Sequence, residues 1–83
     1  MKYTISHHAG EMLRERRIDI EWVEMVLAQP ALKEQDREDS SLEHWFAAIP
    51  ERDGRVLRVV VNIMRTPVHV VTAYFDRAKR GIA

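Results

Sequence analysis

Cysteine is absent from the sequence, which excludes disulfide bonds and thiolate chemistry. Glycine and proline occur three times each, too sparsely for a glycine-rich loop that cradles a phosphate-bearing cofactor, and we expect no cofactor. No apolar run approaches the roughly 20 residues that a bilayer-spanning helix needs. The first ten residues also lack the apolar segment of a secretion signal. These absences predict a cytoplasmic protein that makes no contact with a membrane.

Histidines are few and poorly spaced for a metal site. They are His7, His8, His44 and His69, and a zinc site usually takes three or four ligands. No pair has the i, i+4 spacing that places two ligands on one face of a helix. The side chains of neighbours such as His7 and His8 diverge on a helix. We therefore expect no bound metal.

An excess of charge of either sign is also missing, because 13 Lys and Arg residues balance 13 Asp and Glu residues. This balance argues against a dedicated, strongly basic nucleic-acid binder. The charge is uneven along the chain, however. Residues 1–42 carry six cationic and nine acidic side chains, a net charge of −3, and residues 43–83 carry seven and four, a net charge of +3. The basic half is compatible with a weak RNA footprint, with a complementary surface for self-association, or with neither.

What the chain does have is an apolar stretch over residues 55–75, RVLRVVVNIMRTPVHVVTAYF. Its β-branched residues suit a pleated, half-buried surface. We expect strands over 56–64 and 68–75 joined by a turn over 65–67, where Pro67 has no N–H for strand pairing. The rest of the chain is expected to cover and extend this hairpin.

Two helices are expected before the hairpin. The first runs from about His7 to Arg17 after Ser6 as its N-cap, and the second begins after Asp19 and is stopped by Pro30. The remaining elements, by residue number, are a short lead-in over 3–5, a weak strand over 31–36, a polar loop over 37–42, a strand over 43–49, a turn over 51–54 and a basic tail over 76–83 with little to bury. The chain is too short for a second core. We predict one α+β domain over residues 1–83, with two N-terminal helices packed on a small antiparallel sheet of three to four strands.

The register of the hairpin decides which side chains meet. With a three-residue turn, the opposed pairs are Met64 with Val68, Asn62 with Val70, Val60 with Thr72, and Arg58 with Tyr74. Directly opposed residues point to the same face of a sheet. One face is then apolar apart from His69, and the other mixes valines with polar side chains, which suits helices on the first face and a cleft or a partner on the second.

Arg58 and Tyr74 are the first candidate site. With Thr72 and Asn62 of the hairpin they form a polar face, to which the tail adds the cations Arg77, Lys79 and Arg80. Cleavage of RNA requires cations near the scissile phosphate and an acid or base near the 2′-hydroxyl, and arginine and tyrosine can supply both without a metal. The alternative is an ordinary cross-strand pair in which the guanidinium stacks on the ring.

His8 and Arg16 are the second candidate set. Arg16 ends the stripe formed by Ala9, Met12 and Leu13 on the first helix, and its fork of donors suits a phosphate or a carboxylate. The alternative places His8 in a hydrogen bond at the helix start and has Arg16 bridge the helix to the sheet through a carboxylate or a carbonyl.

Three segments together resemble a known family. SHHAGEMLRERRIDIEWVEMVLAQP, LRVVVNI and VHVVTAYF resemble short bacterial proteins of unassigned function, which are similar in pattern to RelE/ParE-like toxins, notably the BrnT type. The matching positions are Ser6, His8, Ala9, Glu15, Arg16, Ile18, Leu57, Val59, Val60, Val70 or Val71, Thr72 and Tyr74. Two positions depart from the pattern. Met12 stands where many members have arginine, and Arg17 stands where they have glycine, so the turn after the first helix need not adopt a glycine-only conformation.

The resemblance implies a RelE-like fold and a metal-independent endoribonuclease of toxin type. RNA would be the substrate, and an antitoxin protein would cover the basic face. The implied catalytic residues are Arg58, Tyr74 and His8, and the implied RNA-binding residues are Arg16, Arg77, Lys79 and Arg80. The alternative is a non-catalytic domain for protein binding or homodimerisation. Net neutrality and the valines Val56, Val60, Val68 and Val70 on the mixed face favour that alternative.

Overall fold

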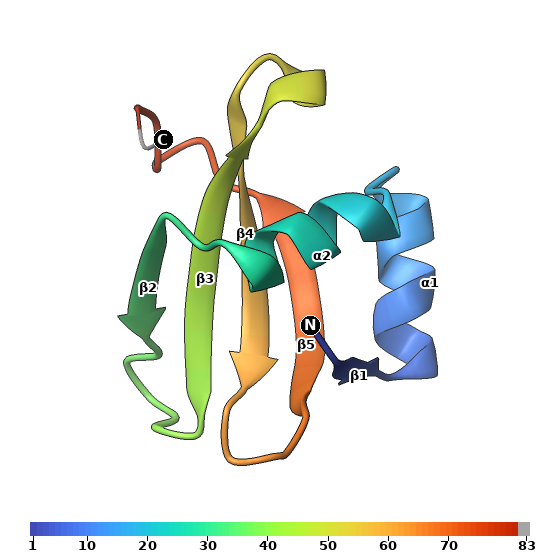
Figure 1. Cartoon of the computed structure of the whole chain (residues 1–83), viewed down its shortest axis with the longest axis vertical. Helices are drawn as coiled ribbons and strands as arrows, with labels where there is room; N and C mark the ends of the chain where they lie inside the picture. The colour runs from blue at the N-terminus through green and yellow to red at the C-terminus, as the bar shows by residue number, and fades with distance from the viewer. Residues whose placement is uncertain (82–83) are drawn as a thin grey trace.

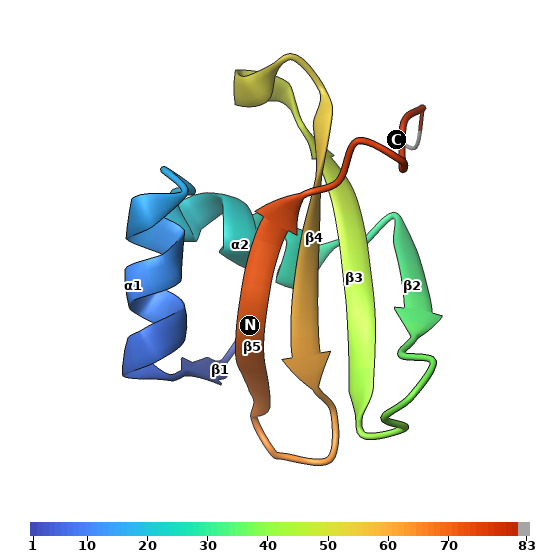
Figure 2. The same ribbon diagram turned by 180° about the vertical axis from the view of Figure 1, so that it is seen from behind.

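A five-stranded sheet forms the centre of the protein, and both helices lie on one side of it (Figures 1 and 2). The computed structural model describes residues 1–81. In chain order the elements are β1 (Tyr3–Ile5), α1 (His7–Glu15), α2 (Ile20–Ala28), β2 (Leu32–Gln35), β3 (Leu42–Ile49), the 3-10 turn η1 (Pro50–Arg52), β4 (Arg55–Asn62) and β5 (Val68–Phe75). The strand order across the sheet is β1-β5-β4-β3-β2.

The sheet differs from the expected one in size and in direction. The domain is α+β, but a purely antiparallel sheet of three to four strands is wrong, because the sheet has five strands and is mixed. The lead-in at Tyr3–Ile5 is a strand that pairs with β5 in parallel, with Ile5 opposite Val70. A parallel pair needs a long connection between its strands, and here the helices and three further strands supply it. Neither helix within residues 1–81 is long and apolar enough to cross a membrane.

Helix α1 begins and ends with recognisable caps. The Ser6 hydroxyl accepts a hydrogen bond of 3.1 Å from the N–H of Ala9, as expected for an N-cap. The helix ends at Glu15, two residues earlier than predicted, because Arg17 adopts a left-handed conformation with φ of 56°. The N–H groups of Arg17 and Ile18 donate to the carbonyls of Arg14 and Leu13 at 3.1 and 2.9 Å, which is the Schellman arrangement. The turn therefore does adopt the conformation that favours glycine, with an arginine in place.

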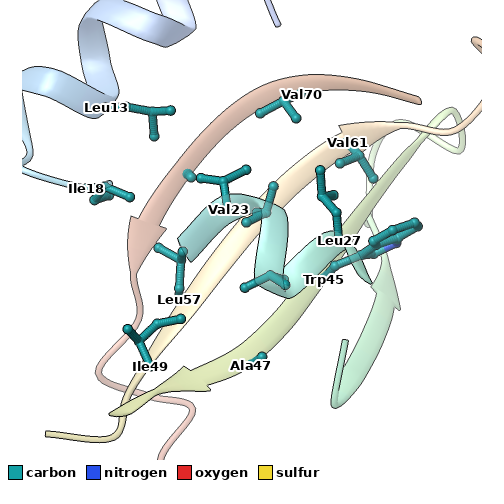
Figure 3. Close-up of a cluster of buried hydrophobic side chains, with 13 residues drawn as sticks. Leu13, Ile18, Val23, Leu27, Trp45, Ala47, Ile49, Leu57, Val61 and Val70 are labelled. Carbon is teal, nitrogen blue, oxygen red and sulfur yellow. The ribbon is translucent and has the colours of Figure 1, made fainter. Parts of the chain in front are cut away.

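The core lies between the helices and one face of the sheet (Figure 3). Helix α2 contributes Val23, Val26 and Leu27, each at most 2% exposed. They pack against a layer of apolar side chains from the central strands, among them Trp45, Leu57, Val59, Val61 and Val70. Burial of this apolar area provides most of the driving force for folding, and it leaves the opposite face of the sheet without a helix.

The hairpin of β4 and β5 has the predicted register at one end only. Arg58 lies opposite Tyr74 and Val60 opposite Thr72, as expected. A bulge then leaves Val71 as an extra residue, so that Val61 pairs with Val70 and Asn62 with His69. The expected pair of Asn62 with Val70 is therefore wrong, and so is that of Met64 with Val68, because β4 ends at Asn62. The extra residue of a bulge reverses the faces of the residues beyond it.

The reversal exchanges two side chains between the faces of the sheet. Val70, expected on the mixed face, is fully buried in the core beneath the helices. His69, expected on the apolar face, lies opposite Asn62 on the other side, where its Nδ1 is 2.7 Å from the Thr4 hydroxyl. The helix-covered face is therefore wholly apolar along β5.

Candidate functional site on the open face of the sheet

The face of the sheet that no helix covers is here called the open face. It carries His44 and Phe46 of β3, Arg58 of β4, and Thr72 and Tyr74 of β5, because alternate residues of a strand share a face. Figure 2 views the sheet from this side, with the C-terminal segment at the upper end of the strands. The site is thus built on the three central strands of the sheet.

Two guanidinium groups flank the ring of Tyr74. Arg58 lies 5.5 Å and Arg16 lies 5.9 Å from the ring centroid. Arg16 comes from the end of α1, and its Nη1 donates to the Thr72 hydroxyl at 3.0 Å and to the Ala73 carbonyl at 2.7 Å. The expectation that Arg16 bridges helix and sheet through a carbonyl is confirmed. These bonds hold the Arg16 guanidinium over the Tyr74 ring.

Arg58 is the centre of a polar chain that sequence reasoning did not anticipate. Its Nη2 donates to the carboxylate of Asp76, and its Nη1 donates to Nδ1 of His44 at 2.9 Å. On the far side of the imidazole, Nε2 of His44 is 2.7 Å from Oδ1 of Asp36. A guanidinium can only donate, so Nδ1 of His44 accepts, and Nε2 carries the proton that is donated to Asp36. The geometry therefore requires a neutral imidazole with its proton on Nε2.

The carboxylates at both ends of this chain are held in their charged form. The hydrogen bond from His44, together with those from the N–H groups of Asp39 and Glu38, lowers the pKa of Asp36. Burial acts most strongly on Asp76 and opposes ionisation, but the Ala78 N–H and the Arg58 guanidinium outweigh it and lower its pKa. Hydrogen bonds to an ionised carboxylate favour that form. Both groups are acceptors at neutral pH.

On the open face, cationic side chains rather than a helix lie over Phe46. Its ring is fully buried, and the Arg58 guanidinium and the Lys79 ammonium lie 4.8 and 5.3 Å from its centroid. Lys79 also donates to Oε2 of Glu34 at 2.6 Å. The segment after β5, expected to have little to bury, therefore crosses the sheet and is held there by Asp76 and Lys79. Residues 82–83 of the predicted tail lie outside the described residues.

A hollow of about 590 Å³ opens beside this network. Its lining comes from β2, the loop after β2, the sheet and the tail, and consists of Glu34, Gln35, Asp36, Arg37, Glu38, His44, Arg58 and Lys79. Three acidic and three basic side chains are among them. Arg58 and Lys79 each have a carboxylate partner. The polar surface expected around Arg58 is therefore present, but Arg58 and Lys79 within it are paired with carboxylates.

The predicted site residues lie in three different places. Arg58, Tyr74, Arg16 and Lys79 come together on the open face, as their contacts above describe. His8 does not join them, because it is exposed at the start of α1, at the opposite end of the helix from Arg16. Arg77 and Arg80 line a different hollow at the end of the sheet.

Three residues of the network were missed by sequence reasoning: Asp36, His44 and Asp76. A signal for His44 was present, because alternation along β3 places His44 and Phe46 on one face, and Phe46 lies opposite Arg58. Asp36 reaches His44 only because β2 is a real strand of the sheet. Asp76 was missed because nothing in the composition of the tail indicates that the tail crosses the sheet.

The site offers hydrogen-bond donors and one neutral imidazole rather than a metal cage. Within residues 1–81, no three side chains of His, Asp or Glu are grouped so that they could hold a metal ion. The arginine pair around Tyr74 could bind a phosphate or a carboxylate. The imidazole of His44, with Asp36 behind it, has the arrangement of an oriented acid–base group.

Comparison with known proteins gives a family without an assigned activity. The model of that family, described as a domain of unknown function (DUF4258), matches residues 5–75. This range includes every element from the end of β1 to the end of β5. No curated protein matches the chain, and no solved structure matches it.

Proposed function

Because the chain belongs to the DUF4258 family, whose activity is unassigned, we propose from the geometry of the open face that it is a toxin-like endoribonuclease that acts without a metal. The observation that carries the proposal is the position of Tyr74 between the guanidinium groups of Arg16 and Arg58. Two cations beside one phenol suit a phosphodiester, whose negative charge increases in the transition state. The resemblance of the sequence to short bacterial proteins of RelE/ParE-like pattern also favours this class.

The proposed reaction is attack of the 2′-hydroxyl oxygen on the adjacent phosphorus. The phosphate displaces Asp76 from Arg58 and binds between Arg58 and Arg16. When Arg58 turns toward the phosphate, it frees Nδ1 of His44, which takes the proton of the 2′-hydroxyl while Asp36 orients the ring. Tyr74 gives its proton to the departing 5′-oxygen. A bond from O2′ to phosphorus forms and the bond to O5′ breaks, which leaves a 2′,3′-cyclic phosphate and a 5′-hydroxyl.

The sequence suggested Tyr74 or His8 as the acid–base group, and this scheme uses His44 in place of His8. His8 lies at the far end of α1, whereas His44 contacts Arg58 directly. Lys79, beside Phe46 in the same hollow, is a further phosphate contact in the proposal. The proposed partner is an antitoxin that covers the open face when the enzyme is inactive in the cytoplasm.

The test is RNA cleavage and growth arrest on expression without a partner protein. Arg58→Ala and Tyr74→Phe should each reduce the cleavage rate by about 100-fold or more, the range for loss of a transition-state donor or of an acid–base group. Arg65→Ala, an exposed residue in the turn between β4 and β5, is the control and should cleave normally. If the unmutated protein neither cuts RNA nor slows growth, the proposal fails.

A non-catalytic protein-binding domain is the second candidate. It is favoured by the carboxylates of Asp76 and Glu34, which already bind Arg58 and Lys79. The valines that suggested a dimer face do not support it, because Val56 and Val60 are at most 5% exposed and Val70 is under the helices. Sizing chromatography discriminates the two. A dimer that persists at low concentration favours the binding domain, and a monomer counts against homodimerisation.

A further inference from the structure

A second hollow, of about 560 Å³, lies at the end of the sheet where the turn between β3 and β4 meets the tail. Figure 1 shows both segments at the same end of the strands. Arg55 comes from the start of β4, and Arg77 and Arg80 come from the tail, and all three line the hollow. Arg52 of η1 lies close to Arg55, because both guanidinium groups contact the Phe75 ring. Arg52, Arg55, Arg77 and Arg80 are here called the arginine cluster.

Stacking holds two members of the arginine cluster in place. The guanidinium groups of Arg55 and Arg52 lie 4.5 and 5.2 Å from the centroid of the Phe75 ring. Arg52 also lies 5.6 Å from the ring centroid of Trp22. Two cations on one ring repel each other, and an anion between them would remove that repulsion. The fold thus presents orientated donors at a place where positive charge accumulates.

No member of the arginine cluster forms a salt bridge with an acidic side chain within residues 1–81. None of its four guanidinium groups takes part in a salt bridge or a side-chain hydrogen bond among the described residues. Two carboxylates line the hollow, those of Asp53 and Asp76, and the Asp76 carboxylate binds Arg58. The contrast with Arg58 and Lys79 in the first hollow, which both have carboxylate partners, indicates that these arginines are kept for an external anion.

We propose that the arginine cluster is a second phosphate subsite, which binds the backbone of single-stranded RNA. The tail separates the two hollows, with Lys79 lining the first and Arg77 and Arg80 lining the second. A strand that crosses the tail places one phosphate beside Arg58 and another in the arginine cluster. The substrate is therefore an oligonucleotide rather than a mononucleotide. The identity of the ligand as RNA rests on the proposed function, and the second subsite rests on the cluster itself.

The experiment measures binding separately from cleavage. A fluorescent 2′-O-methyl oligonucleotide of about 12 nucleotides, within the range of single-strand site sizes, cannot be cut because its 2′-oxygen is blocked. Its affinity is measured at several salt concentrations for the unmutated protein and for Arg77→Gln/Arg80→Gln. Arg14→Gln/Arg65→Gln, at exposed positions on α1 and in the turn between β4 and β5, is the control with the same loss of charge.

Loss of two phosphate contacts should weaken binding and make the plot of log affinity against log salt shallower by about 1.4, at roughly 0.7 per contact on a single strand. The control pair should keep the slope of the unmutated protein. Equal slopes and affinities for the two double variants overturn the inference, as does an unmutated protein that does not bind the oligonucleotide. If binding weakens as expected but the unmutated protein cuts no RNA, the subsite stands and the proposed ribonuclease fails.

Discussion

Arg17 adopts a backbone conformation that is unfavourable for a residue with a side chain. Its φ of 56° lies in the left-handed region, where a side chain is strained and glycine is not. The sequence showed that Arg17 occupies a position where the resembled family has glycine, but it did not show that the turn keeps the same conformation. The Schellman bonds from Arg17 and Ile18 impose that conformation.

We expect Arg17→Gly to increase the free energy of unfolding by about 0.5–1 kcal/mol, because the strain of a left-handed residue exceeds the entropy cost of glycine. The matched control is Arg14→Gly on α1, which should lower stability by a similar amount, since glycine within a helix is unfavourable. Urea denaturation of the two variants measures both changes. A loss of stability for Arg17→Gly would contradict the account of the turn.

The strands show what a pattern of residues can and cannot fix. Arg58 pairs with Tyr74 as predicted, although two steps of the reasoning were wrong. The connection between β4 and β5 is longer than three residues and shifts the register by one, and the bulge at Val71 shifts it back. The pattern of residues along a strand predicts which side chains share a face. A bulge depends on packing against neighbouring strands, and the sequence of one strand does not reveal that packing.

Pairings between distant segments are the other feature of the fold that the sequence did not reveal. Strands β1 and β2 are short. Each forms an edge of the sheet by pairing with a strand elsewhere in the chain. The network of Asp36, His44 and Arg58 depends on the pairing of β2 with β3. The cap of Arg58 by Asp76 depends on the path of the tail. The two central strands were therefore predictable from sequence, whereas their register beyond Val60 and the residues that surround Arg58 were not.

The tail after β5 places a carboxylate where the proposed substrate phosphate would bind. We expect Asp76→Asn to raise the affinity of the uncleavable oligonucleotide several-fold, because the competing negative charge on Arg58 is removed. The same change should lower stability, since Arg58 then lacks its charged partner. Fluorescence binding and urea denaturation measure the two effects, with Glu21→Gln, an exposed position on α2 outside both hollows, as the control for loss of one negative charge. Equal affinity for both variants would show that Asp76 does not compete with phosphate.

At the scale of the whole molecule, the two faces of the sheet are stabilised in different ways. Apolar packing under the helices holds one face, and ion pairs and hydrogen bonds hold the open face. The first does not titrate, whereas the second contains Asp36 and Asp76, whose pKa values are lowered from the usual 3.8. The open face should therefore be the acid-sensitive side.

A carboxylate with a lowered pKa in the folded state contributes stability that is complete above its unfolded value and is lost as the pH falls through the folded one. We expect the free energy of unfolding to fall below about pH 4, from the usual 3.8 of these groups downward. In Asp36→Asn/Asp76→Asn the decline over the same range should be smaller, from a lower starting stability at pH 7. Urea titrations across this range measure both curves, and parallel curves would contradict the assignment.

The pairing of β1 with β5 also has a consequence for synthesis of the protein on the ribosome. The partner of β1 follows it by more than 60 residues in the chain, so residues 3–5 emerge from the exit tunnel long before Val68–Val70 can pair with them. Domains with such distant contacts fold slowly and expose apolar surface while they wait. The nascent domain should therefore acquire its native sheet only after Val68–Val70 have left the exit tunnel.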